Sequence, residues 1–180
     1  MHDYSELAPI PDKSEINTLC TYLSEKEMLN LFGKPGALTT DCSEPTNPKI
    51  LSNLVQLDIT PHIHVRAFKP FAIALKKGFD DLKVGNFDLY NQVKSAGALC
   101  CRAIRGSTKN YSKHSYGCSI DLYCGSDVTA LGDPHTQLGI KIVYSYLKKY
   151  DIFWGAGFKR PDSMHYEASK EMLYKYFDIT

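Results

Sequence analysis

The chain has 180 residues, 43% of them hydrophobic and 23% charged, so it can bury one core without disulfide staples. Its 21 basic and 20 acidic residues give a formal net charge of +1, and no block of lysine and arginine stands out, which argues against a nucleic-acid partner. No apolar stretch approaches the roughly 18 residues that a membrane helix needs, and internal repeats are absent.

The first half of the chain predicts two helices separated by a long connection and a strand. Residues 14–31 carry apolar side chains at helical spacing, and Ser14 can cap this helix. Residues 33–53 are rich in Gly, Pro, Ser, Thr and Asn and predict an irregular connection. A strand over residues 54–59 and a helix over residues 70–82 are expected to follow.

The second half predicts a sheet followed by helices. The expected strands are residues 89–93, 99–104 and 118–124. A loop over residues 125–132 leads to the expected helices, which are residues 134–150, opened by Pro134, and 169–177. Because strands and helices are segregated, we expect an α+β fold with a central antiparallel sheet and flanking helices. We expect residues 1–180 to form a single catalytic domain, in which 1–85 are a helical and irregular elaboration and 86–180 the core.

A histidine and an aspartate, His114 and Asp121, lie seven residues apart with Gly117 between them. Seven residues rise about 10 Å on a helix. On a straight strand they span roughly 23 Å, and the two side chains lie on opposite faces. Neither element brings both side chains to one ion, so we expect a bend at Gly117, because glycine accepts backbone angles closed to other residues. The strand that follows directs Asp121 away from the face that carries Cys118 and Cys124.

A second histidine, His165, follows Asp162 by three residues. Two imidazoles and one carboxylate leave a zinc ion one open position for water, which is typical of a catalytic rather than a structural zinc site. Asp162 alone would be interpreted as a turn residue. Together with His165 and the upstream pair, it is interpreted as catalytic. The remaining histidines are interpreted as surface or structural residues: His2, His62, His64 and His135.

The six cysteines have no CxxC spacing, which gives little support to a Cys-rich structural zinc site. Residues 1–11 are short and polar and do not resemble a secretory signal. We therefore expect free, mostly buried thiols at Cys20, Cys42, Cys100, Cys101, Cys118 and Cys124.

These motifs resemble the zinc D-Ala-D-Ala carboxypeptidase and L-alanyl-D-glutamate endopeptidase family, which shares its core fold with the hedgehog signalling domain. The first family motif corresponds to Ser112, His114, Gly117, Ser119 and Asp121. Ser119 stands where the family commonly has alanine. The second motif corresponds to Asp162 and His165, and the following Tyr166-Glu167 is similar to the tail of the phage endolysin branch. Residues 153–158 resemble the Trp-Gly stretch before that motif, so the resemblance covers about residues 96–167.

The resemblance implies the role of each site residue. One Zn²⁺ ion would be bound by His114, Asp121 and His165, and the general base would be Asp162. An upstream arginine would bind the scissile carbonyl oxygen. Arg102 and Arg105 are both candidates, and we favour Arg102 because it lies within the expected strand.

Three further residues are expected around the metal or along the substrate groove. Glu167 is either a competing base or, preferably, a residue that orients one of the two histidines. Ser112 precedes the first motif, and Trp154 is a candidate wall of the cleft.

The resemblance implies a zinc metallopeptidase that hydrolyses peptide stems of bacterial peptidoglycan. We favour an endolysin-like L-alanyl-D-glutamate endopeptidase. A D,D-carboxypeptidase acting on D-Ala-D-Ala termini is the second hypothesis, and a non-catalytic zinc-bearing binding module of the same fold is the third. The expected protein is a monomer with no nucleic-acid or membrane partner. It would be made in the cytoplasm without a signal peptide and act on the cell wall, as a phage or prophage product does.

Overall fold

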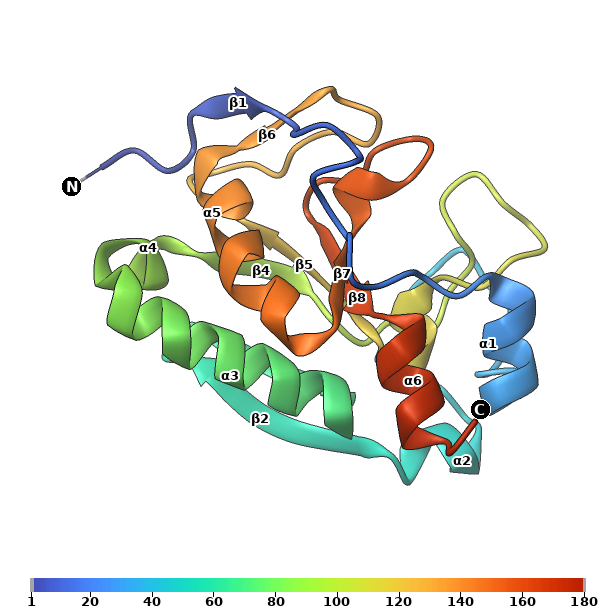
Figure 1. Cartoon of the computed structure of the whole chain (residues 1–180). Helices are drawn as coiled ribbons and strands as arrows, with labels where there is room; N and C mark the ends of the chain where they lie inside the picture. Colours follow the sequence, from blue (N-terminus) through green and yellow to red (C-terminus); the bar gives the residue numbers. More distant parts are fainter. Residues whose placement is uncertain (1, 180) are drawn as a thin grey trace.

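A four-stranded antiparallel sheet forms the centre of the computed structural model, which describes residues 2–179 (Figure 1). Its strands are, in spatial order, β4 (Lys94–Gly97), β5 (Ser119–Tyr123), β8 (His165–Ala168) and β7 (Ile152–Trp154). Two smaller antiparallel sheets pair β1 (Leu7–Pro9) with β6 (His135–Gln137) and β2 (Leu54–Thr60) with β3 (Ile63–Phe68). The expected α+β class with an antiparallel sheet is confirmed.

Helices α3 and α5 pack against each other and against the sheet, where α5 contacts β5 and α3 contacts β7 (Figure 1). The α-helices are α1 (Glu25–Phe32), α2 (Pro48–Leu51), α3 (Lys69–Gly85), α4 (Phe87–Gln92), α5 (Leu138–Leu147) and α6 (Lys170–Tyr176). Three short 3₁₀ helices are η1 (Lys113–Tyr116), η2 (Lys148–Tyr150) and η3 (Gly155–Gly157). The predicted strand 54–59, the predicted strand 118–124 and the predicted helices 70–82 and 169–177 are confirmed within one to three residues at each end.

The predicted helix over residues 14–31 is wrong over residues 14–24, more than half of its length, because α1 begins only at Glu25. Ser24 and Glu27 form a capping box in which each side chain accepts a hydrogen bond from the other residue's backbone N–H, and this fixes the start of the helix. Upstream, Asn17 has a φ of 54°, which no right-handed helix accommodates. Its side-chain amide instead pairs with the backbone of Trp154 at 2.8 and 2.9 Å.

Three other expected elements differ in the structure. Residues 89–93 lie in or next to α4 rather than in a strand, because Asn86 caps this helix by accepting a hydrogen bond from the Leu89 N–H at 3.0 Å. Residues 99–104 form only isolated bridges, at Cys101 and Ala103, instead of a strand. Residues 134–150 begin with β6, because His135–Gln137 pairs with β1, a segment far away in sequence.

The expectation of six free thiols is corrected for one pair. Cys42 and Cys100 form a disulfide across 58 residues of chain, with Cα atoms 5.2 Å apart. The neighbouring residues Ser43 and Cys101 pair through their backbones, and this tertiary contact, which sequence spacing cannot reveal, brings the two sulfurs together. The other four cysteines are free and buried, as predicted: Cys20, Cys101, Cys118 and Cys124.

One hydrophobic core runs through both halves of the chain. Phe71, Leu75 and Phe79 of α3 are fully buried in the same cluster as Ile120 and Leu122 of β5. The sheet that carries the candidate site therefore rests on a helix from the first 85 residues. Among residues 2–179, no helix combines the length and apolar character needed to cross a membrane.

Candidate metal centre

His114 is held by the short helix η1, whose two ends are set by its neighbours. The Ser112 side chain accepts a hydrogen bond from the His114 N–H at 3.4 Å and begins the turn. Gly117 ends the turn in the left-handed conformation, with a φ of 68°, so the chain bends where the sequence predicted. A Cβ there would lie 3.0 Å from the Phe68 backbone nitrogen, and this close backbone contact also favours glycine. The His114 Nδ1 lies 2.6 Å from the Ala98 carbonyl oxygen, so Nδ1–H donates there and Nε2 is directed elsewhere.

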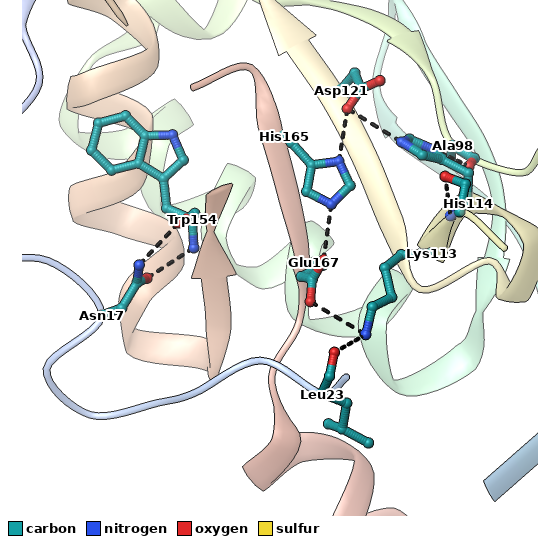
Figure 2. A network of polar contacts seen from close by, with 10 residues as sticks. Asn17, Leu23, Ala98, Lys113, His114, Asp121, Trp154, His165 and Glu167 are labelled. Atoms are coloured by element: carbon teal, nitrogen blue, oxygen red, sulfur yellow. Dashed lines mark hydrogen bonds and ion pairs between the residues drawn. The ribbon is translucent and has the colours of Figure 1, made fainter. Parts of the chain in front are cut away.

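Asp121 and His165 are direct neighbours on the adjacent strands β5 and β8. Asp121 Oδ1 lies 3.0 Å from His165 Nδ1 and 3.3 Å from His114 Nε2, so both rings converge on one carboxylate oxygen (Figure 2). The two ring centroids are 5.2 Å apart. The alternation of β5 thus presents Asp121 to the cavity described below, while Ile120 and Leu122 are buried in the core, as predicted.

The chemistry of these three side chains fits a zinc ion. Two imidazole nitrogens and one carboxylate oxygen lie within 4.8 Å of one another, and both histidines are buried. Nitrogen and oxygen donors of this kind are the ones that catalytic zinc sites use with one position left open. The nitrogen of each ring that is directed away from Asp121 has its own acceptor, as is usual for metal-binding histidines.

The charges of the cluster shift the pKa values of its members. Burial would raise the pKa of Asp121, but hydrogen bonds from His114 and His165 hold it well below the ordinary value. Burial would likewise lower the pKa of His165, but its hydrogen bonds to Asp121 and Glu167 outweigh that effect and raise the pKa to about 10. In the metal-free cluster, the positive charge of the His165 ring is therefore stabilised by the carboxylates of Asp121 and Glu167.

Behind His165 lies a second carboxylate that sequence reasoning had placed in this neighbourhood. The Glu167 Oε2 is 3.0 Å from His165 Nε2, so it accepts a hydrogen bond when this ring nitrogen carries a proton (Figure 2). Its other oxygen lies 3.8 Å from the Lys113 Nζ. Sequence analysis did not single out Lys113 or the Ala98 carbonyl. The only feature of the sequence that could have indicated Lys113 was its position next to His114. A contact made by a backbone carbonyl cannot be recognised from residue types.

Asp162 lies in the turn that leads into β8. Its backbone N–H donates to the Gly155 carbonyl at 3.0 Å, and its own carbonyl accepts the His165 N–H at 3.1 Å. Among the described residues its Oδ1 atom is buried without a hydrogen-bond partner. Burial raises the pKa of this carboxyl, and positive charge on His165 and Arg105 opposes the rise only in part.

A cavity of about 480 Å³ opens onto the cluster. Its lining includes the three candidate ligands, Asp162, Glu167 and both candidate arginines. The N-terminal segment forms another wall through Tyr22 and Glu25, and Phe158 and Leu131 add apolar surface. Part of the wall of the cavity thus comes from residues 1–85, which we expected to be an elaboration of the core.

The structure brings both candidate arginines to this cavity, and neither lies in a regular strand, so strand alternation does not decide between them. Arg102 is half-buried, and its Nη1 donates to the Ala103 carbonyl at 3.0 Å. Arg105 is exposed, at the start of a turn.

Trp154 does not line the cavity, contrary to the expectation that it forms a wall of the cleft. It is fully buried and stacks on Tyr144 and Tyr166. Its Nε1–H donates to the Ser163 carbonyl at 2.7 Å. Trp154 therefore supports the turn between Asp162 and His165 from behind.

One comparison with known proteins agrees with this geometry. A family model described as D-alanyl-D-alanine carboxypeptidase, in the M15 group of peptidases, matches residues 105–168. This range contains Asp162 and the three candidate ligands but not Arg102 or the N-terminal wall of the cavity. The match supports a peptidase. No curated protein matches the chain.

Proposed function

We propose that this chain is a zinc metallopeptidase that hydrolyses peptide stems of bacterial peptidoglycan. The observation that carries the proposal is the convergence of His114, Asp121 and His165 in one cavity with Asp162. Asp162 is half-buried, and its Oδ1 atom is buried without a hydrogen-bond partner among the described residues. The family match over residues 105–168 supports the same class of reaction.

Each residue of the site has a role in this proposal. His114, Asp121 and His165 would hold one zinc ion, which when bound polarises a carbonyl and lowers the pKa of water to about 7. Asp162 accepts a proton from the attacking water and then donates it to the leaving amine. Its burial suits this role, because a raised pKa brings a carboxyl closer to the operating pH.

An arginine would stabilise the negative charge that develops on the scissile carbonyl oxygen. Arg102 remains the first choice, because it is half-buried in the cavity lining and its guanidinium keeps donors beyond the one that contacts Ala103. Arg105 is the alternative, because its charge reaches Asp162.

We favour an L-alanyl-D-glutamate endopeptidase of the endolysin type. The aspartate at position 162 and the Tyr166-Glu167 tail support this choice, because they resemble the phage branch. A D,D-carboxypeptidase is the second candidate, and the description of the matching family model favours it. With the endopeptidase function, we propose that the protein is a phage or prophage product that acts on the cell wall as a monomer.

The decisive experiment compares wild-type protein with Asp162→Asn on purified sacculi. Wild-type protein should release new amino termini, and mass spectrometry of the fragments identifies the bond that is cut. Asp162→Asn should lose at least about 10²-fold in rate, because it removes the proton acceptor, while it keeps the metal.

A matched control is Asp41→Asn, which changes an exposed carboxylate that lines no part of the cavity and should leave the rate unchanged. Equal release by wild type and Asp162→Asn would contradict the role of Asp162. No release by a zinc-loaded wild type would favour the non-catalytic binding module.

A further inference from the structure

Glu167 is the carboxylate behind the candidate metal ligand His165, and it is almost completely buried, with 1% of its side chain exposed. One oxygen accepts from His165 Nε2 at 3.0 Å. The other has no hydrogen-bond partner among residues 2–179. Burial of an ionised carboxylate costs free energy unless a positive charge compensates it. The second oxygen of Glu167 therefore needs a positively charged group nearby.

That group is Lys113, whose Nζ lies 3.8 Å from Glu167 Oε1 and whose side chain is 17% exposed. The same Nζ donates a hydrogen bond to the Leu23 carbonyl in the segment just before α1 (Figure 2). Lys113 also immediately precedes His114 in η1. One lysine thus lies next to one candidate ligand in sequence and contacts the acid that holds the other.

The direction of the His165 ring depends on this arrangement. When Nε2–H donates to Glu167, the lone pair available to a metal is on Nδ1, the nitrogen that faces Asp121. Hydrogen-bond partners of this kind orient metal-binding histidines and raise their basicity. Loss of the Lys113 charge would leave Glu167 buried beside a single partner and free to shift.

We propose that Lys113 and Glu167 act together as a positioning pair that sets the orientation of His165 and thereby the affinity for zinc. The Leu23 carbonyl holds Lys113 in place and so makes the N-terminal segment part of the metal centre. This inference rests on the proposed zinc site, but it concerns residues that do not touch the metal.

The test measures the zinc dissociation constant by competition with a chromophoric chelator. Lys113→Met and Glu167→Gln should each weaken zinc binding by about 10- to 100-fold, the range found when such outer partners of metal ligands are removed. The double variant should be little worse than either single one, because the two residues act as a unit. Lys113→Arg, which keeps the charge, should restore most of the affinity.

The matched control is Lys109→Met, because Lys109 is exposed and forms no side-chain hydrogen bond or ion pair in the described structure. It should bind zinc like the wild type. A second readout is the ¹⁵N spectrum of the histidine rings in the zinc-loaded protein. In the wild type, His165 should bind zinc through Nδ1 and carry its proton on Nε2. In Glu167→Gln a second population should appear, in which the ring binds through Nε2 and carries its proton on Nδ1, and a merely structural role would not produce it.

The outcomes separate this inference from the proposed function. If wild-type protein binds no zinc, the proposed function fails. If wild type binds zinc and both variants bind equally well with unchanged ring spectra, the positioning pair alone is refuted. Circular dichroism checks the fold of each variant. If Lys113→Met does not fold, Glu167→Gln, which preserves side-chain volume, decides the question.

Discussion

At the scale of single residues, the candidate metal centre depends on which nitrogen of each histidine is free to bind an ion. His114 and His165 use opposite ring nitrogens toward Asp121, because the Ala98 carbonyl holds Nδ1 of one ring and Glu167 holds Nε2 of the other. The two rings therefore approach one oxygen from different directions. A histidine elsewhere on η1 or β8 could not reproduce this arrangement without its own acceptor.

The raised pKa of His165 predicts how the stability of the metal-free protein depends on pH. Because this pKa rises from 6.5 to about 10 on folding, the stabilisation is fully present below pH 6.5 and is lost as the pH rises through about 10. In chelator, the difference in unfolding free energy between wild type and His165→Gln should therefore shrink between pH 7 and pH 10. Urea denaturation at several pH values measures it.

A control for this pH series is His135→Gln, which changes an exposed histidine outside the cavity. Its difference from wild type should stay small across the same range. A His165→Gln difference that is constant from pH 7 to pH 10 would contradict the coupling of His165 to its two carboxylates.

Sequence reasoning identified the residues that meet in the site, because the spacing around His114 and Asp121 excludes regular elements and requires a bend. Of the groups behind them it named Glu167, which contacts His165, but not the other two. The Ala98 carbonyl belongs to the backbone, and the contact of Lys113 with Leu23 joins residues 90 positions apart. Such groups are set by tertiary packing, which a local pattern does not encode.

At the scale of elements, Gly117 is the point at which the candidate metal centre depends on backbone conformation. Its φ of 68° costs a residue with a Cβ about 1–2 kcal/mol. An added Cβ would also lie 3.0 Å from the Phe68 backbone nitrogen and 3.3 Å from the Ala67 Cα, where backbone cannot easily yield. We expect Gly117→Ala to lower the unfolding free energy by more than the conformational cost alone and to weaken zinc binding.

Gly106→Ala provides the matched control for this prediction. Gly106 also has a positive φ, 81°, but an added Cβ would meet no atom within 4 Å. Denaturant unfolding and zinc titration of both variants therefore separate the conformational cost from the steric one. If the two substitutions cost the same and neither affects zinc binding, close packing at Gly117 does not position His114.

The elements themselves were predictable where a local signal determined them. The strand that carries Asp121 alternates clearly, and α6 begins at a capping serine, Ser169. The prediction of helices and strands failed where hydrogen bonds from single polar side chains determined the local structure, because such side chains do not contribute to the apolar periodicity. Asn86 converts residues 87–92 into a helix, and the amide of Asn17 bonds to the backbone of Trp154 and so holds the preceding segment against β7.

At the scale of the whole molecule, the two halves of the chain depend on each other. The matching family model covers residues 105–168, yet the core under that region includes Phe71, Leu75 and Phe79 of α3. The disulfide between Cys42 and Cys100 joins the same two halves. None of these contacts could be read from sequence, because each joins residues that are distant along the chain.

This dependence predicts that residues 86–180 do not fold alone, even though they contain every candidate metal ligand. Without α3, the surfaces of α5 and β7 that pack against it would be exposed to water, and apolar surface costs about 25 cal/mol per Å² exposed. The isolated fragment should show no cooperative unfolding transition and no tight zinc binding. Mixing it with residues 1–85 should restore both, because the two pieces then supply one core. Circular dichroism and zinc titration measure each state, with the intact chain as control, and a fragment that folds and binds zinc by itself would contradict the shared core.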